Sequence, residues 1–202
     1  MSAAVMTADT VIVGGRIVTD SWSGDGTVVI GEGRVLAILD PSVDIDYLGA
    51  TRVIDAAGRL LLPGGVDPHC HLAIPLGAYV TLDSFASASA AALAGGTTTI
   101  VDFAIPVPGE DPVVALDKKL DMAHESHCDY AFHGCLGARP DDVQGVIDAF
   151  ADRGVRTVKL FTTYRGELMV DLETIEAVMV ALQRHEGLTY IHAEENTAIE
   201  AA

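Results

Sequence analysis

Short apolar runs separated by glycine turns fill the first sixty residues of the chain. They lie at residues 10–20 (TVIVGGRIVTD), 26–40 (GTVVIGEGRVLAILD) and 51–65 (TRVIDAAGRLLLPGG). Strand-like runs at such close spacing are typical of small antiparallel β domains. We therefore expect an antiparallel β domain over residues 1–62.

The pattern changes after Pro63, where apolar strands begin to alternate with longer helical stretches. The predicted strands lie in VDPHCHL, TTTIVDFAI, DYAFHGCL, RTVKLFT and TYIHAEE. Predicted helices lie at 84–96, 111–126, 141–154 and 171–187, and a further helix begins at Asn196. Such alternation predicts a parallel sheet with helices outside it, over residues 63–202.

Residues typical of helix N-caps and C-caps stand at the expected ends of the predicted helices. Asp83 and Asp141 stand where N-caps are expected, because their carboxylates can accept bonds from the first free N–H groups. Gly95, Gly154 and Gly187 stand where C-caps are expected.

Five parallel units fit two architectures, an open doubly wound sheet or a (β/α)8 barrel. The open sheet usually has a glycine-rich phosphate loop after its first strand, and no such loop follows His71. A barrel places its chemistry at the carboxyl ends of its strands, where the notable polar residues of this chain fall. A complete barrel needs about 250 residues. We therefore expect an incomplete α/β barrel of about five of the eight strands.

Composition narrows the class of protein. The chain has 29 acidic and 12 basic residues and a net charge of −17, which disfavours nucleic acid and anionic membranes as partners. Residues 85–109 are almost free of charge, but glycines, prolines and Asp102 divide them, so we expect no membrane span. Three cysteines without framework spacing and no signal-like N-terminus predict a reduced, cytoplasmic protein.

Two histidines one residue apart are the first candidate for chemistry. Side chains at alternate positions of a strand point to one face, so His69 and His71 share a face with Asp67. Two imidazoles placed in this way can bind one metal ion. An isolated pair of this kind is nevertheless more often structural.

A lysine and a third histidine lie on later strands. Lys159 stands in an apolar strand and either extends to solvent or is buried, in which case its amine loses its charge and becomes a nucleophile. Such an amine can add CO2 and become a carbamate. His192 ends the fifth strand, on the side where a barrel has its site, although a lone histidine on a strand usually packs in the core.

The remaining histidines are interpreted as structural. His133 and Cys135 share a strand face and could form a rival N/S pair, but no further soft ligand is placed to complete a site. His124, His127 and His185 fall on helix ends or surface stretches.

Four stretches together resemble the cyclic amidohydrolases, in particular the D-hydantoinase and dihydropyrimidinase group. They are GGVDPHCHL, ALAGGTTTIVDFAIP, VKLFTTYRGELMVD and YIHAEE. The resemblance runs over essentially the whole chain. It implies a β-sandwich domain attached to a barrel with two divalent metals, usually zinc, in a protein that forms a homo-oligomer, a tetramer in this group.

The resemblance also implies roles for single residues. His69 and His71 would bind the first metal, Lys159 would be the carbamylated bridge, and His192 would bind the second metal, with Asp67 as a possible outer partner. Tyr164 would be catalytic and stabilise the oxyanion formed on the substrate carbonyl. The small-molecule substrate would be a hydantoin or dihydropyrimidine, opened to an N-carbamoyl amino acid.

Departures from the family pattern define the alternatives. The arginine that dihydroorotases carry after the paired histidines is replaced here by Leu72-Ala73-Ile74. Allantoinase stays open, as does a non-catalytic, dihydropyrimidinase-like scaffold, although a scaffold has no need of the four ligands. A fourth metal-binding histidine and the catalytic aspartate belong to later strands in this family. We therefore expect these 202 residues to be the N-terminal part of such an enzyme and to be inactive alone.

Overall fold

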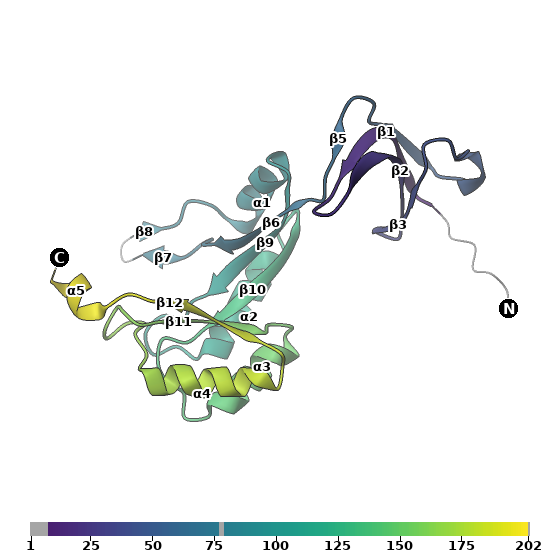
Figure 1. Cartoon of the computed structure of the whole chain (residues 1–202). Coiled ribbons are helices and arrows are strands. Elements are labelled where there is room, and N and C mark those ends of the chain that lie inside the picture. Colours follow the sequence, from purple (N-terminus) through teal and green to yellow (C-terminus); the bar gives the residue numbers. More distant parts are fainter. Residues whose placement is uncertain (1–7, 77–78, 202) are drawn as a thin grey trace. The chain divides into compact units, whose positions relative to one another are not determined.

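The computed structural model describes residues 8–76 and 79–201, which divide at Pro63 into two compact units (Figure 1). The first unit holds the strands β1 (Thr10–Val18), β2 (Ser23–Gly31), β3 (Arg34–Leu39), β4 (Arg52–Asp55) and β5 (Leu60–Leu61), with a short 3-10 helix at Asp46–Leu48. Its sheet has the order β3-β2-β1-β4, and β5 also pairs with β1.

The predicted β domain is confirmed, but its pairing is not purely antiparallel. β1, β2 and β3 form antiparallel pairs, whereas β4 and β5 both run parallel to β1. β3 and β4 run in the same direction as β1, and the connection of about a dozen residues between them carries the chain from one edge of the sheet to the other, as a crossover to a parallel strand requires. Glycine turns in the sequence do not report this connection, so the expectation of an antiparallel sheet was wrong in part.

The second unit is the predicted parallel sheet with helices outside it. Its strands are β6 (Gly65–Cys70), β9 (Thr97–Ala104), β10 (Asp129–Cys135), β11 (Thr157–Phe161) and β12 (Leu188–His192), and they lie in the order β12-β11-β10-β9-β6, all parallel. After β6, two strands of two residues each, β7 (Pro75–Leu76) and β8 (Tyr79–Val80), form an antiparallel pair. The pattern analysis did not predict it.

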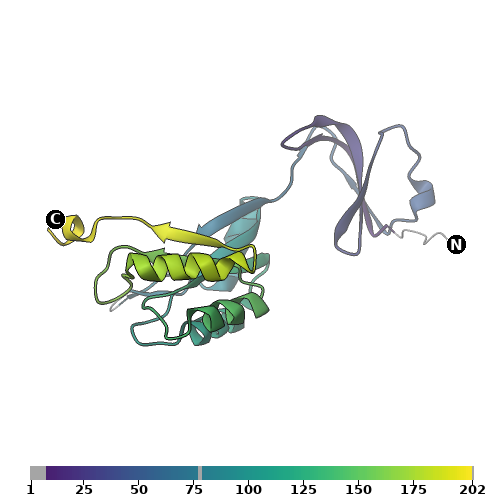
Figure 2. The ribbon, with the colours of Figure 1, turned by 60° about the horizontal axis from the view of Figure 1, so that its bottom comes forward.

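Helices connect successive strands and cover one face of the sheet. They are α1 (Phe85–Ala94), α2 (Pro112–Ala123), α3 (Val143–Asp152) and α4 (Leu172–Gln183), with α5 (Asn196–Glu200) after β12. Figure 2 shows α4 lying along β12, with α3 beside it. The core between sheet and helices contains fully buried Leu116, Ile147, Phe150, Val158 and Val178. No helix in the described part of the chain is long and apolar enough to cross a membrane.

Two predicted N-caps differ from the observed ones. The N-cap of α1 is Ser84, in a reciprocal capping box with Ser87, and Asp83 accepts a bond from the Ser87 hydroxyl instead. The N-cap of α3 is Asp142, one residue after Asp141. Both shifts arise because neighbouring polar residues compete for the same free N–H groups.

Of the three glycines predicted as C-caps, only Gly95 is the observed C-cap of its helix. Gly95 is the C-cap of α1, and Gly154, with φ +79°, follows the α3 cap at Arg153. Gly187 is not a cap, because α4 ends at Gln183 and the left-handed residue is Glu186. A Cβ at Gly187 would lie 2.4 Å from the Arg156 carbonyl oxygen, so glycine is needed there for close approach of backbone.

Candidate metal and active site

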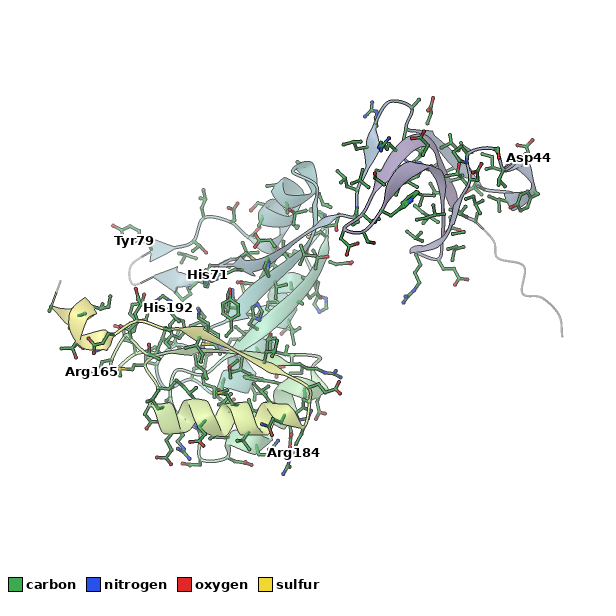
Figure 3. The ribbon with its side chains drawn as sticks, viewed as in Figure 1. Asp44, His71, Tyr79, Arg165, Arg184 and His192 are labelled. Atoms are coloured by element: carbon green, nitrogen blue, oxygen red, sulfur yellow. The ribbon has the colours of Figure 1, made fainter. Side chains whose placement is uncertain are left out.

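The carboxyl ends of β6, β11 and β12 place five predicted site residues around one pocket. His69, His71, Lys159, Tyr164 and His192 all line a cavity of about 600 Å³, together with apolar side chains that include Ile74 and Leu168. Figure 3 shows His71 and His192 toward the same end of the sheet, although they come from its two opposite edges. The curl of the parallel sheet therefore brings residues as distant in the chain as His71 and His192 to one site, as expected for a barrel.

The paired histidines face each other. Their Nε2 atoms lie 3.2 Å apart, and both rings contact the buried ring of Phe103, with which His71 stacks at 4.9 Å. Burial, and after it repulsion from His69, lowers the pKa of His71, which favours the neutral imidazole. Two imidazole nitrogens that converge in this way can both bind the same cation.

Tyr190 orients one of these rings, and sequence reasoning missed it. Its hydroxyl lies 3.0 Å from Nδ1 of His69, the nitrogen opposite the one that faces His71. A partner at Nδ1 fixes the tautomer and leaves Nε2 for a ligand. The signal was present in the sequence, because Tyr190 stands two residues before His192 on the same strand face.

Lys159 is buried rather than extended to solvent. Only 4% of the residue is exposed, and Nζ lies 4.9–5.4 Å from the ring centroids of Phe103, Phe161 and Tyr190. No described residue accepts a hydrogen bond from it. Burial lowers the pKa of the amine, which favours the neutral, nucleophilic form.

His192 already has a partner in this structure. Its Nε2 lies 2.5 Å from a carboxylate oxygen of Glu194, and its ring stacks on Phe161 at 5.5 Å. A cation could therefore bind at Nδ1, or at Nε2 after Glu194 turns away. Glu194 is a second residue that the sequence analysis did not single out.

Asp67 does not reach either imidazole. Its carboxylate accepts a hydrogen bond of 3.0 Å from the backbone N–H of His69. It therefore fixes the bend of the chain at the first histidine, while its side chain remains exposed.

The rival pair His133 and Cys135 packs in the interior. Both ring nitrogens of His133 are engaged, Nδ1 with the Thr157 hydroxyl at 2.6 Å and Nε2 with the Pro68 carbonyl at 3.0 Å. Burial lowers the pKa of this imidazole and raises the pKa of the Cys135 thiol to about 12. Neither group is free to bind a metal. Within residues 8–76 and 79–201, no three His, Cys, Asp or Glu side chains converge as a metal site.

A buried ion pair holds the backbone just after His71. Lys119 of α2 contacts Asp102 of β9 at 2.8 Å and donates to the Leu72 carbonyl oxygen, while Asp102 accepts bonds from the N–H groups of Leu72 and Phe103. β6 ends at Cys70, so this pair takes the place of ladder bonds beyond the strand. Sequence reasoning missed it: Asp102 lies in one of the four family-like stretches, but no local pattern pairs it with Lys119.

Comparison with known proteins shows what the chain as a whole is similar to. The chain is 34% identical over 194 residues to dihydropyrimidinase of Rattus norvegicus and 36% identical over 201 residues to D-hydantoinase of Streptomyces coelicolor. These matches cover 93% and 96% of this chain but 37% and 42% of the relatives. The chain therefore spans about two fifths of their length. No family model matches the chain.

Solved structures show the same fold. Dihydropyrimidinase from Brevibacillus agri matches with a TM-score of 0.86 and 34% identity, over 95% of this chain and 41% of that protein. A more distant match, at 18% identity and a TM-score of 0.63 over 92% of this chain and 53% of the other, is an atrazine chlorohydrolase variant from Arthrobacter aurescens, described as complexed with zinc and atraton. At that identity the likeness establishes the fold alone.

Proposed function

Because this chain belongs to the family of cyclic amidohydrolases that includes D-hydantoinase and dihydropyrimidinase, we propose that the whole protein hydrolyses the cyclic amide bond of hydantoins or dihydropyrimidines. By whole protein we mean the polypeptide in which these 202 residues occur, whatever its length. The product is an N-carbamoyl amino acid. The observation that carries the proposal is the meeting of His69, His71, Lys159, Tyr164 and His192 at one pocket.

The donor set of this pocket fits divalent metal ions, with zinc the first choice. His69 and His71 would hold one ion through the nitrogens that face each other, and His192 would bind the second. Imidazole nitrogen is a preferred ligand of zinc. When bound, two such ions lower the pKa of the attacking water and polarise the substrate carbonyl.

Lys159 would join the two ion sites as a carbamate. The lone pair of its neutral amine forms a bond to the carbon of CO2, and one proton leaves for solvent, so that the side chain gains a negative charge and two ligand oxygens. Burial among aromatic rings supports this step, because it disfavours the ammonium form that cannot react.

The other residues of the pocket bind and orient the substrate. Tyr164 has its ring 5.6 Å from that of His192, and its hydroxyl would donate a hydrogen bond to the oxygen that gains charge as water adds to the carbonyl. Ile74, Ile105 and Leu168 give the wall an apolar part that excludes water and contacts the ring substituent. Tyr190 keeps His69 in the tautomer that leaves Nε2 free.

The test is ring opening by the whole protein. We expect hydrolysis of 5-substituted hydantoins or dihydrouracil that stops on exhaustive chelation and returns with zinc, and allantoin tested beside them distinguishes an allantoinase. His71→Ala should abolish both bound metal and turnover, whereas His185→Ala, which alters a histidine paired with Asp148 on the helices, should leave both unchanged. Turnover that survives chelation would contradict the proposal, and a protein without bound metal would favour a non-catalytic scaffold.

A further inference from the structure

Asn196, the only asparagine of the chain, bridges the two residues on either side of Tyr164. Its Oδ1 accepts a hydrogen bond from the Thr163 hydroxyl at 3.2 Å and another from the Arg165 backbone N–H at 3.3 Å. An N–H group can only donate, so the atom that faces Arg165 is the oxygen and the amide has one orientation. Asn196 and Thr163 are both buried, with 4% and 0% of their surface exposed.

The loop between these contacts has an uncommon backbone. Tyr164 has φ +67°, in the left-handed region that large side chains rarely adopt, so other contacts must hold it there. Its carbonyl oxygen accepts bonds from three N–H groups, those of Glu167, Leu168 and Met169. Asn196 supplies the contacts on the other side, from a different element.

The same two segments are joined a second time. The single proton of the Thr162 hydroxyl has two carbonyl acceptors in reach, that of Glu194 at 2.7 Å and that of His192 at 3.1 Å, and the hydroxyl oxygen accepts a bond from the N–H of Glu194. Arg165 also lies near α5, with its guanidinium 3.6 Å from Glu200 (Figure 3). The position of Tyr164 therefore depends on the residues that follow His192.

The burial of the Asn196 amide costs free energy of folding, because one of its polar atoms makes no hydrogen bond. Among the described residues, its Nδ2 is the one fully buried side-chain nitrogen or oxygen found without a hydrogen-bond partner. A buried donor without a partner destabilises the folded protein, so in a core residue it calls for an explanation. The two hydrogen bonds that Oδ1 accepts, one on each side of Tyr164, explain why an asparagine is buried here.

We propose that Asn196 is a positioning residue that holds the loop at Tyr164 so that the tyrosine hydroxyl points into the pocket. This inference rests on the proposed function for the part that concerns turnover. Asn196 itself touches no substrate, because it is buried behind the loop. Its effect is exerted through Tyr164.

A double-mutant cycle in the whole protein tests this role. Tyr164→Phe removes the hydroxyl and should lower kcat by about 10²- to 10³-fold, the usual effect of losing one oxyanion donor. Asn196→Ala should lower kcat at least about tenfold, with KM and bound metal little changed. In the Tyr164→Phe background the same substitution should have almost no further effect, because the group it positions is already missing.

Two further variants separate positioning from loss of structure. Asn196→Asp keeps an oxygen that can accept both hydrogen bonds, so it should recover most of kcat. Glu195→Ala removes the α5 cap that accepts from the Ala198 N–H, in the same segment, and should leave kcat unchanged. Additive losses in the cycle, or an Asn196→Ala variant with lower thermal stability but normal kcat, would overturn the inference.

Amide exchange gives a readout that needs no turnover. The Arg165 N–H should be protected in the unaltered whole protein and in Glu195→Ala, and should exchange faster in Asn196→Ala. Equal exchange in all three would overturn the inference regardless of activity. If the protein opens no cyclic amide but Arg165 responds as expected, the proposed function fails while the role of Asn196 in holding the loop stands.

Discussion

At the scale of single residues, the burial of Lys159 has the largest chemical consequence. Only 4% of the residue is exposed, and burial lowers the pKa of its amine, so the neutral amine, or an anionic carbamate paired with metal ions, is favoured over an isolated buried ammonium group. Lys159→Ala in the whole protein should lower metal affinity by about 100-fold or more, since even the outer partners of ligands contribute ten- to hundredfold. A short carboxylic acid in the buffer should restore part of the turnover.

The matched control for this variant is another lysine. Lys118→Ala removes an amine that is two-thirds exposed and paired with Glu110 on the surface, and it should leave metal content and kcat as they were. Metal analysis and initial rates, with and without added acid, make the comparison. A Lys159→Ala protein with normal metal and a normal rate would refute the carbamate.

The cysteines give a second prediction at this scale. Burial, the largest cause, raises the pKa values of the Cys70 and Cys135 thiols to about 12. At pH 8 only about one thiol in 10⁴ is therefore ionised at either residue. Cys135 is also fully buried. Iodoacetamide should therefore modify neither thiol in the native protein at pH 8 and both after unfolding in urea. Peptide mass analysis measures this, and rapid native modification of Cys135 would contradict the placement of its strand.

At the scale of elements, the ion pair between Lys119 of α2 and Asp102 of β9 fastens the end of β6. Lys119→Met leaves a buried carboxylate without its partner, which should lower the free energy of unfolding by about 3–5 kcal/mol. The double variant Asp102→Leu with Lys119→Met should lose less, because no charge remains buried. Urea unfolding of the three proteins measures both values. A single variant as stable as the unaltered protein would show that the pair is not formed.

Ion pairs between helices predict a loss of stability in acid. Arg153 donates to Asp117 and joins α3 to α2, and His185, which follows α4, lies 2.6 Å from Asp148 of α3. The hydrogen bond from Arg153 lowers the pKa of Asp117, and those from His185 and Gln144 lower the pKa of Asp148, from the ordinary value of 3.8. Because the folded pKa lies below the unfolded one, this stabilisation is complete above pH 3.8 and disappears as the pH falls through the folded value. Thermal unfolding between pH 6 and pH 2.5 should show a shallower decline in a variant with Asp117→Asn and Asp148→Asn, and equal declines would contradict the prediction.

The sequence was sufficient for the order and type of the elements in the parallel unit. Alternation of apolar strands with amphipathic helices is a local signal, and the parity of HCH at the end of β6 placed two imidazoles on one face. The hydrogen bonds His69–Tyr190, Thr163–Asn196 and Leu72–Asp102 could not be predicted in the same way. Each of these three joins residues about thirty or more positions apart, and depends on strand register and on the curl of the sheet, which no local pattern reports.

At the scale of the whole molecule, the parallel sheet has two strands with a neighbour on one side only. In the described ranges β6 pairs only with β9 and β12 only with β11, and β12 also exposes Leu188 and part of Ile191. Unpaired edges and exposed apolar side chains promote association. The free energy of unfolding of a domain is only about 5–15 kcal/mol. The free-energy cost of leaving an apolar face of the sheet in water can exceed that value.

The 202 residues by themselves should therefore associate or be partly molten, and should not turn over a cyclic amide. The chain offers His192 alone as an imidazole for the second ion. His133 uses both ring nitrogens, and His185 lies beside Asp148. His124 caps the far end of α2, and His127 follows it, before the amino end of β10. Sedimentation of the purified chain with zinc and bicarbonate, together with hydantoin and dihydrouracil assays, tests both statements. We expect oligomers with less than two metal ions per chain and no ring opening. A compact monomer with clear turnover would show that these residues complete the site without further chain, and the assignment of His133 to packing would then have to be abandoned first.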